Sequence, residues 1–273
     1  MFYNEVIKIA REELGINIDK IFIEQAQIGV FLTAVKLSTG SYGLAFTDSG
    51  NCLYQNKNER NYGDFSPTKI TGRTLKELLS CDTPGSLLTS LKAAAINGLS
   101  TFMMKEKNFR IAVNSDTFDL INFNGKKKVT MVGGINSYIR RISDTNCELE
   151  VLELNENAIQ PEHIKYYVPA EKANDAIPGS DVVIITGASL VNNTIEDLLQ
   201  MPDPAATVVV VGPSAGIYPE VLFKRNVDLI GATRITNPEA VMSVVREGGT
   251  GYHLFRYGAE KVTIIRDDYE AKA

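Results

Sequence analysis

VVIITGASLVNNT (Val182 to Thr194) and TVVVVGPSAGIYP (Thr207 to Pro219) share one pattern, a run of β-branched residues that ends in small polar residues. VTMVGGIN (Val129 to Asn136) carries a similar pattern earlier in the chain. A continuous apolar run of this kind is typical of a parallel strand that is buried on both faces. Small polar residues after such a strand leave backbone N–H groups and helix N-termini open to a ligand. The three stretches therefore predict a crevice that holds a small polar or anionic molecule.

From Lys126 onward the sequence alternates between strand and helix patterns. We expect strands over 129–132, 149–153, 181–185, 207–211, 227–230 and 261–265. We expect helices over 172–177, 194–200, 219–225 and 238–247. The last helix is well delimited, because Asn237 caps it, Pro238 opens it and Gly248 ends it. Since each helix connects two strands, this part is predicted to be a Rossmann-like domain with a mostly parallel sheet and helices on both faces.

The first part of the chain has the pattern of an α+β domain. We expect a helix over 4–14, and extended runs over 20–25, 29–37 and 42–46. Turn residues between and after these runs predict an antiparallel meander. Further helices are expected over 74–79, 84–99 and 116–121, and Thr83 is the predicted N-cap of the second, with Pro84 at its first position. Asn122-Phe123-Asn124-Gly125 is the predicted linker, which divides the chain into residues 1–124 and 125–273.

Charge and cysteine content exclude several classes of protein. The net charge of -5 argues against a nucleic-acid partner, because neutralising phosphates requires clustered Lys and Arg. No apolar stretch approaches the roughly 20 residues that span a bilayer, and charges within the first residues argue against a signal peptide. Cys52, Cys81 and Cys147 lie far apart, and His163 and His253 have no close His or Cys partner. We therefore expect no disulfide framework and no zinc site, and a cytoplasmic location is the simplest expectation.

A glycine turn and an acidic residue occupy the places that a dinucleotide-binding fold uses for its cofactor. Gly133-Gly134 follows the first strand of the second part, and Glu153 ends the next strand, about twenty residues later. In this interpretation Glu153 accepts hydrogen bonds from the ribose hydroxyls of a nucleotide or of S-adenosylmethionine. The segment GGINSY is not GxGxxG, however, so a tight turn beside an exposed acid is an equally good interpretation.

The loop after the next central strand is a second candidate for ligand binding. Asn193 is expected to cap the following helix, with Glu196 three residues later, in a relative of the capping box. That structural role does not explain Thr186, Gly187 or Asn192, which lie on the approach from the strand. Because this loop lies at the carboxyl end of a central strand, we expect it to contact a ligand.

Gly212, Pro213 and Ser214 form a third candidate. Pro213 fixes φ, while Gly212 and Gly216 can adopt positive φ and present N–H groups to an anion. Ser214 is a candidate donor to that anion rather than a nucleophile, because no GxSxG elbow surrounds it and His is scarce. The alternative is a Gly-Pro turn that only reverses the direction of the chain.

These stretches also carry a resemblance to a known family. VTMVGGI, SDVVIITGASLVNNTIEDLL, VVVVGPSAGIYPEVLF and VDLIGATRITNPEAVMSVVREGG together resemble the heavy-metal chelation family, which was long catalogued as a domain of unknown function. GLAFT and KAAAINGLS are similar to the N-terminal partner domain of that family, so the resemblance covers nearly the whole chain. It implies a first domain that resembles the enolase amino-terminal fold and packs on a Rossmann-like domain, with a cleft between the two.

The resemblance also implies which residues bind a ligand in that cleft. The matching motif positions are Asn97, Gly133, Glu153, Thr186, Gly187, Asn192, Asn193, Thr194, Gly212, Pro213 and Ser214. The role proposed for the family is the binding or handling of metals through a small chelating molecule. Since the sequence has no Cys or His cluster, we expect an organic ligand to hold any heavy metal, and no side chain is assigned as a metal ligand.

Three functions stay open from the sequence. The first is a cytoplasmic protein that binds, and in one version modifies, a small polar heterocycle or chelator in the interdomain cleft, in the context of heavy-metal handling. The second is an enzyme that uses a nucleotide or S-adenosylmethionine, and the third is a non-enzymatic metal-binding or sensor protein. In each case the expected partner is a small molecule, neither a nucleic acid nor a membrane. Catalytic residues are not assigned, and homo-oligomer formation stays open.

Overall fold

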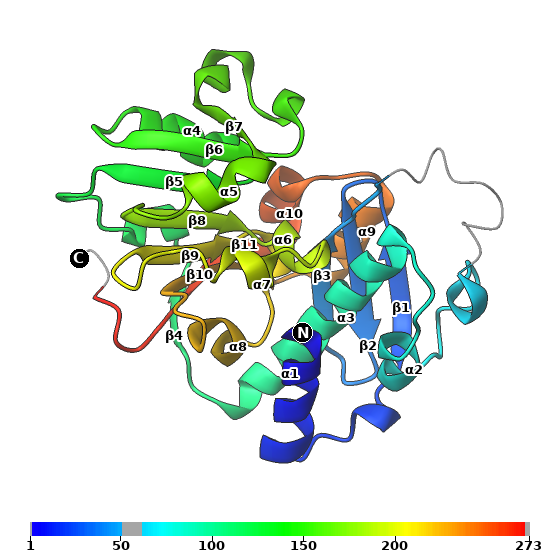
Figure 1. Ribbon diagram of the computed structural model, residues 1–273. Helices are drawn as coiled ribbons and strands as arrows, with labels where there is room; N and C mark the ends of the chain where they lie inside the picture. Colours follow the sequence, from blue (N-terminus) through cyan, green and yellow to red (C-terminus); the bar gives the residue numbers. More distant parts are fainter. Residues whose placement is uncertain (1, 51–61, 271–273) are drawn as a thin grey trace.

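Two β-sheets of unequal size organise the computed structural model, which describes residues 2–50 and 62–270 (Figure 1). The smaller sheet is antiparallel and is formed by the first part of the chain. The larger sheet is mostly parallel and takes most of its strands from the second part. This arrangement confirms the predicted α/β fold class, and similarity to solved structures, given below, supports it.

The smaller sheet is the antiparallel meander that the turn residues predict. Its strands β1 (Ile23–Ile28), β2 (Leu32–Leu37) and β3 (Tyr42–Phe46) pair in that order. The helix α3 (Ser86–Met103) packs on β2 and β3 at close range, because a Cβ atom on Gly43 would lie 2.0 Å from the Ala94 carbonyl oxygen. A glycine at this position therefore sets the distance between helix and sheet.

The first two helices lie where the apolar pattern predicts them. α1 (Phe2–Lys8) continues into a π-helical turn, Ile9–Glu13. α2 (Leu75–Leu79) begins after Thr74, whose Oγ1 accepts a hydrogen bond from the Glu77 N–H at 3.2 Å. The Glu77 carboxylate in turn accepts from the Thr74 N–H, so the pair forms a capping box.

The start of α3 differs from the prediction. The helix begins at Ser86, with Gly85 at its N-cap, so the prediction of Thr83 as N-cap and Pro84 as first helical residue is wrong. The reason is the backbone of Gly85, whose φ of 159° lies outside the helical region and interrupts the helix there. Of the predicted helix over 116–121, a 3-10 turn at Thr117–Leu120 is present.

The larger sheet has the strand order β4-β11-β10-β9-β8-β5-β6-β7. Its strands are β4 (Arg110–Val113), β5 (Lys128–Val132), β6 (Glu148–Glu153), β7 (Tyr167–Pro169), β8 (Val182–Thr186), β9 (Thr207–Val211), β10 (Leu229–Ile235) and β11 (Ala259–Ile265). The strands from β10 to β7 are parallel, as predicted, whereas β11 and β4 run antiparallel to their neighbours. The larger sheet thus includes β4 from the first part of the chain, and the boundary at residue 124 stays a proposal.

Short helices accompany the strands of the larger sheet. They are α4 (Asn136–Ser143), α5 (Ala173–Ala176), α6 (Ala188–Val191), α7 (Ile195–Leu198), α8 (Pro219–Phe223), α9 (Pro238–Arg246) and α10 (Gly251–Tyr257). Asn237 caps α9 as predicted, because its Oδ1 accepts from the Ala240 N–H at 3.2 Å. The predicted cap of α7 is wrong: Thr194 stands at the N-cap position, and Asn193 adopts a φ of 61°. Within residues 2–50 and 62–270, no helix combines the length and apolar character needed to cross a bilayer.

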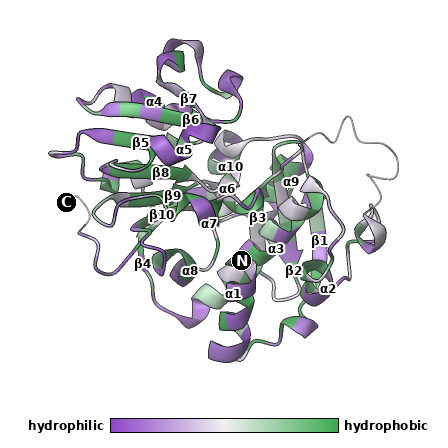
Figure 2. Ribbon diagram, viewed as in Figure 1, coloured by the Kyte–Doolittle hydropathy of each residue, from purple (hydrophilic) through white to green (hydrophobic). Residues whose placement is uncertain are grey.

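Both faces of the larger sheet are buried. Figure 2 shows hydrophobic residues along β8 and β9, at the centre of this sheet. Val183 and Val210 point to the face that packs with α1, α3 and the smaller sheet, whereas Ile184 and Val209 point to the face covered by α4. α9, which follows β10, packs on β1 and β2. The smaller sheet is therefore enclosed between α3 and a helix from the second part of the chain.

Candidate functional site

The strand order creates a switch point between β5 and β8. After β5 the chain moves outward to β6 and β7, and it then returns to the other side of β5 to form β8. Gly133 follows β5 and Thr186 ends β8, and a Cβ atom on Gly133 would lie 2.8 Å from the Thr186 Cγ2. Open parallel sheets bind ligands outside the carboxyl ends of their strands, at such switch points.

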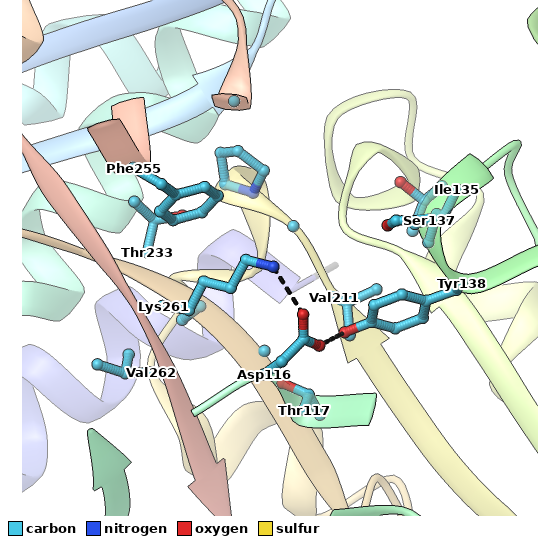
Figure 3. Close-up of a pocket in the computed structure, with 16 residues that line it drawn as sticks. Asp116, Thr117, Ile135, Ser137, Tyr138, Val211, Thr233, Phe255, Lys261 and Val262 are labelled. Carbon is cyan, nitrogen blue, oxygen red and sulfur yellow. Dashed lines mark hydrogen bonds and ion pairs between the residues drawn. The ribbon is translucent and has the colours of Figure 1, made fainter. Parts of the chain in front are cut away.

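A cavity of about 280 Å³, which we call the edge cavity, opens at this end of the larger sheet. The predicted residues Thr186, Gly212 and Pro213 line it. Figure 3 shows Phe255 of α10 on one side of the edge cavity and Ile135, at the start of α4, on the other. The structure thus brings part of the predicted ligand-binding set to one cavity.

Three charged or polar side chains form a hydrogen-bonded chain along the edge cavity (Figure 3). The Lys261 Nζ donates to Asp116 Oδ2 at 2.6 Å, and the Tyr138 hydroxyl donates to Asp116 Oδ1 at 2.6 Å. The Phe118 N–H also donates to Oδ1, at 3.1 Å, which fixes the carboxylate at the start of the 3-10 turn after β4. Asp116 therefore holds a cation from β11 and a phenol from α4 in one place.

The protonation states of Asp116 and Tyr138 follow from their contacts. Burial on its own raises the pKa of Asp116, but the hydrogen bonds from Lys261 and Tyr138 outweigh it, and the pKa of the carboxyl lies below its ordinary value. Burial and the negative charge of Asp116 both raise the pKa of the Tyr138 phenol. Near neutral pH, Asp116 is therefore a carboxylate and Tyr138 is a protonated phenol.

Lys261 is the cationic group of the edge cavity. Its side chain is 46% exposed, so the ammonium group can meet a ligand while it stays paired with Asp116. The Lys261 Nζ also lies 5.5 Å from the centroid of the Phe255 ring, within the range of a cation–π contact. The cavity therefore presents a positive charge directly beside an aromatic face, an arrangement that suits a polar ring or an anionic group.

Glu153 and Gly134 bind each other rather than facing the edge cavity. The Gly134 N–H donates to Glu153 Oε2 at 2.7 Å, and the N–H groups of Leu154 and Asn155 donate to Oε1 at 2.8 and 3.1 Å. Three backbone donors thus engage both oxygens of the carboxylate. Its structural role is to fasten the loop after β5 to the loop after β6.

Ser214 and Asn97 connect the smaller sheet to the loop after β9. The Phe46 N–H donates to Ser214 Oγ at 2.7 Å. The Asn97 Nδ2 donates to the carbonyl oxygens of Leu44 and Ser214 at 2.7 and 3.0 Å. Both side chains are almost completely buried, so they hold β3, α3 and this loop together.

The remaining predicted residues fall into two groups. Gly187 is a packing residue: a Cβ atom there would lie 2.7 Å from the Ala215 backbone nitrogen. Asn192 Oδ1 accepts from the N–H and the hydroxyl of Thr194, which closes the turn before α7. Asn193 lines a different hollow, beside the side chain of Tyr3, so the structure does not bring this turn to the edge cavity.

Asp116, Tyr138 and Lys261 are the residues that the sequence analysis does not assign to the site. Asp116 follows β4 and Lys261 lies near the start of β11, and both positions face the same edge of the sheet because the two strands are antiparallel. β4 has no continuous apolar run, so the sequence gives no strand that would place Asp116 at this edge. Recognition of β4 is the signal that would identify Asp116 and Lys261 as neighbours.

The donor set of the edge cavity does not fit a directly bound heavy metal. Soft metals prefer thiolate and imidazole ligands, whereas Asp116 is the carboxylate of this cavity and is engaged by Lys261 and Tyr138. Over the described part of the chain, no three side chains of His, Cys, Asp or Glu gather as a metal site. Cys81 and Cys147 are free thiols, and Cys52 lies outside the described residues.

A second cavity, of about 510 Å³, lies between α3 and β3 on one side and β4, β10 and β11 on the other. We call it the inter-sheet cavity. The predicted residues Asn97 and Pro213 line it. Pro213 lines the edge cavity as well, so the predicted set is divided between two neighbouring cavities.

Comparisons with known proteins agree with this architecture. Two family models match the chain, at residues 116–264 and 11–100, and both carry the description "Putative heavy-metal chelation". Among solved structures, a protein with unknown function from Pyrococcus horikoshii has a TM-score of 0.74 at 18% identity, over 97% of this chain and 98% of that chain. Another, from Desulfitobacterium hafniense, has a TM-score of 0.67 at 19% identity, over 97% of this chain and 100% of that chain. At these identities the likeness shows the fold alone, and no curated protein matches the sequence.

Proposed function

The chain belongs to the family described as "Putative heavy-metal chelation", and we propose that it binds a small polar heterocycle or chelator in the edge cavity. The observation that carries the proposal is the chain of hydrogen bonds from Lys261 through Asp116 to Tyr138. These three hydrogen-bonded side chains lie at the carboxyl edge of a mostly parallel sheet, beside Thr186 and Gly212. Ligands of such sheets bind at this edge.

The walls of the edge cavity support a small ligand with a ring. Phe255 offers an aromatic face, Ile135 and Val211 offer aliphatic surface, and Lys261 offers a charge. Small-molecule pockets combine mostly apolar walls with a few placed polar groups in this way. At about 280 Å³ the cavity is close to the lower end of the range for such pockets, roughly 300 Å³, so it suits a compact ligand.

A heavy metal enters this proposal as the cargo of the bound chelator. The ligand supplies the soft donor atoms, and the protein recognises the ligand through Lys261 and Phe255. Asp116 takes no part in coordination, because its two oxygens accept hydrogen bonds from Lys261 and Tyr138. The chelator thus supplies the metal ligands and the protein binds the chelator. This agrees with the preference of soft metals for sulfur ligands over carboxylates.

The nucleotide alternative has less support than the chelator. Its motivation was Glu153, and three backbone N–H groups account for the position of that carboxylate. No separate observation favours a ribose in the edge cavity over another polar ligand.

A thermal-shift screen tests the proposal. The wild-type protein and the Lys261→Met variant are screened in parallel against heterocycles, small chelators, nucleotides and S-adenosylmethionine, each with and without divalent metals. We expect a compound that raises the Tm of the wild type, because a ligand that binds only the folded state stabilises it. The shift should be smaller in Lys261→Met and unchanged in Lys69→Met, which removes an exposed lysine far from the cavity in sequence.

The outcome of the screen is decisive in both directions. A shift that requires both metal and chelator supports the handling of a metal complex, whereas a shift with the organic compound alone supports binding of the ligand itself. Equal shifts in the wild type and in Lys261→Met for every active compound would contradict the assignment of the edge cavity. Glu153→Gln serves as a further variant, and loss of nucleotide binding in it would restore the nucleotide alternative.

A further inference from the structure

The inter-sheet cavity adjoins the edge cavity, and Pro213, Ala232, Thr233 and Val262 line both. Successive strand residues point to opposite faces, so Lys261 and Val262 of β11 point to different sides of the sheet. Ala232, Val262 and Ile264 belong to the core that faces α3, whereas Val211 belongs to the opposite core. The inter-sheet cavity extends from these shared residues toward α3, and its volume of about 510 Å³ lies within the size range of ligand pockets.

Asn97 presents a hydrogen-bond acceptor that no protein group uses. Its side-chain amide donates both N–H bonds, to the carbonyl oxygens of Leu44 and Ser214, which fixes the orientation of the amide. Within the described residues, no protein group donates to Oδ1, and because Asn97 lines the inter-sheet cavity this oxygen is accessible from that cavity. An accessible amide oxygen held in a fixed orientation can accept a hydrogen bond from a ligand that brings an N–H or O–H donor.

Positive charge gathers at the mouth of the same cavity. Lys105 and Arg234 line it and are both exposed. Arg234 pairs with Glu260 through Nε, which leaves other guanidinium donors available, and Lys105 has no carboxylate partner in the described part of the chain. Two cations against one anion give this mouth a net positive charge that attracts an anionic group.

The walls between these polar groups are apolar. Ile111 of β4, Ile264 of β11 and Met104 after α3 line the cavity, and Ile111 is 39% exposed. Asn97 and Lys105 lie eight residues apart along α3 and its 3-10 continuation, which corresponds to about 12 Å along the axis. The acceptor and the cation thus stand at opposite ends of an apolar space.

We propose that the inter-sheet cavity is a second binding site, for an organic carboxylate with an apolar body and a hydrogen-bond donor at the far end. The carboxylate meets Lys105 and Arg234 at the mouth, the body lies against Ile111 and Ile264, and the donor reaches Asn97 Oδ1. This site adjoins the edge cavity, but Asn97, Lys105 and Arg234 do not line that cavity, and the site does not depend on the function proposed for it.

Methyl NMR with three matched probes tests this site. The first probe, 3-(4-hydroxyphenyl)propanoate, carries all three recognised features, whereas 3-phenylpropanoate lacks the donor and 3-(4-hydroxyphenyl)propanamide lacks the charge. We expect the first probe to shift the methyl signals of Ile111 and Ile264, and to leave Ile135 of the edge cavity unchanged. Each control probe should bind about tenfold more weakly, the equivalent of one hydrogen bond to a charged or buried group.

Two variants and a matched control complete the test. Lys105→Ala should weaken the first probe about tenfold but leave the difference between the two propanoates intact, because the donor contact to Asn97 remains. Ile111→Trp should fill the mouth and abolish binding, and Lys69→Ala should leave the affinity unchanged. Substitution of Asn97 itself is avoided, because its amide also holds β3 and the loop after β9.

Three results would overturn the second site. One is the absence of any shift at Ile111 and Ile264 at millimolar probe. Another is a shift at Ile135 and Val211 instead, which would place the carboxylate in the edge cavity. The third is equal affinity for the propanoate and its amide, which would remove the role of the positive mouth.

Discussion

Asp116 illustrates how single residues define the edge cavity. Its carboxylate lies between Lys261, 145 residues away in the sequence, and Tyr138, 22 residues away. The carboxylate side chain is 20% exposed, so its hydrogen bonds are partly shielded from water and contribute more than a surface ion pair. Asp116 thereby fixes the position of the ammonium group to which we assign ligand binding.

Asp116→Asn should lower the free energy of unfolding by about 1.5–3 kcal/mol at pH 7, the range for hydrogen bonds to a charged group. The pKa of Asp116 is lowered in the folded protein relative to its ordinary value, so the carboxylate stabilises the fold at pH values above that ordinary value, about 4. This contribution is lost as the pH falls through the lower folded-state pKa. Urea unfolding of wild type and variant from pH 7 to pH 3 measures both effects.

The comparison needs a matched carboxylate without these contacts. Asp82 is exposed, and Asp82→Asn should change the free energy of unfolding by less than about 0.5 kcal/mol. The wild-type curve should fall more steeply below pH 4 than the curve of Asp116→Asn. Parallel curves would show that Asp116 gains nothing from its partners in the folded state.

The sequence predicts part of this residue-scale picture. Thr186, Gly212 and Pro213 follow recognisable apolar strands, so their place at the carboxyl edge can be predicted from the strand pattern. Asp116 and Lys261 cannot be found in that way, because neither belongs to a motif and their contact depends on tertiary pairing of β4 with β11. Whether the predicted residues bind a ligand stays a prediction.

The close packing of α3 on the smaller sheet depends on the absence of a side chain at Gly43. Gly43→Ala should lower the free energy of unfolding by about 1–3 kcal/mol, because the added Cβ would lie 2.0 Å from the Ala94 carbonyl oxygen and must displace the helix. Gly251→Ala is the control, since no atom lies within 4 Å of its added Cβ. Equal stability of the two variants in chemical denaturation would refute the close approach of α3 to β3.

The cap of α9 gives a prediction at the same scale. Asn237→Ala removes the side chain that accepts from the Ala240 N–H, and it should cost about 1 kcal/mol. Asn237→Ser should retain most of the stability, because serine caps helices through its hydroxyl oxygen. Thermal unfolding of the two variants measures the difference, and an identical Tm for both would argue against the cap.

Strands can be predicted from the sequence where burial on both faces requires a continuous run of apolar residues. β8 and β9 are continuous β-branched runs because both faces of these central strands are buried, and the sequence places them within a residue of their observed ends. β4 is largely exposed and β7 has only three residues, so neither has a pattern that predicts it. Gly85 and Asn193 shift helix starts through backbone conformations that capping rules do not anticipate.

At the scale of the whole molecule, Ser214 and Asn97 join the smaller sheet to the edge of the larger one. Ser214→Ala leaves the Phe46 N–H without its acceptor and should cost about 1–3 kcal/mol of stability. The affinity for a ligand of the edge cavity should change little, because the Ser214 hydroxyl is committed to Phe46. Denaturation and ligand titration of the same variant separate the two effects, and a large loss of affinity with unchanged stability would assign Ser214 to the ligand instead.

The central claim is that the edge cavity holds a small ligand against Lys261 and Phe255. The most direct test is a crystal structure of the protein with the compound that gives the largest thermal shift. The account predicts ordered ligand density within hydrogen-bond distance of the Lys261 Nζ, at the carboxyl ends of β8 and β9. Density for the ligand elsewhere in the molecule, with the edge cavity filled only by solvent, would contradict it.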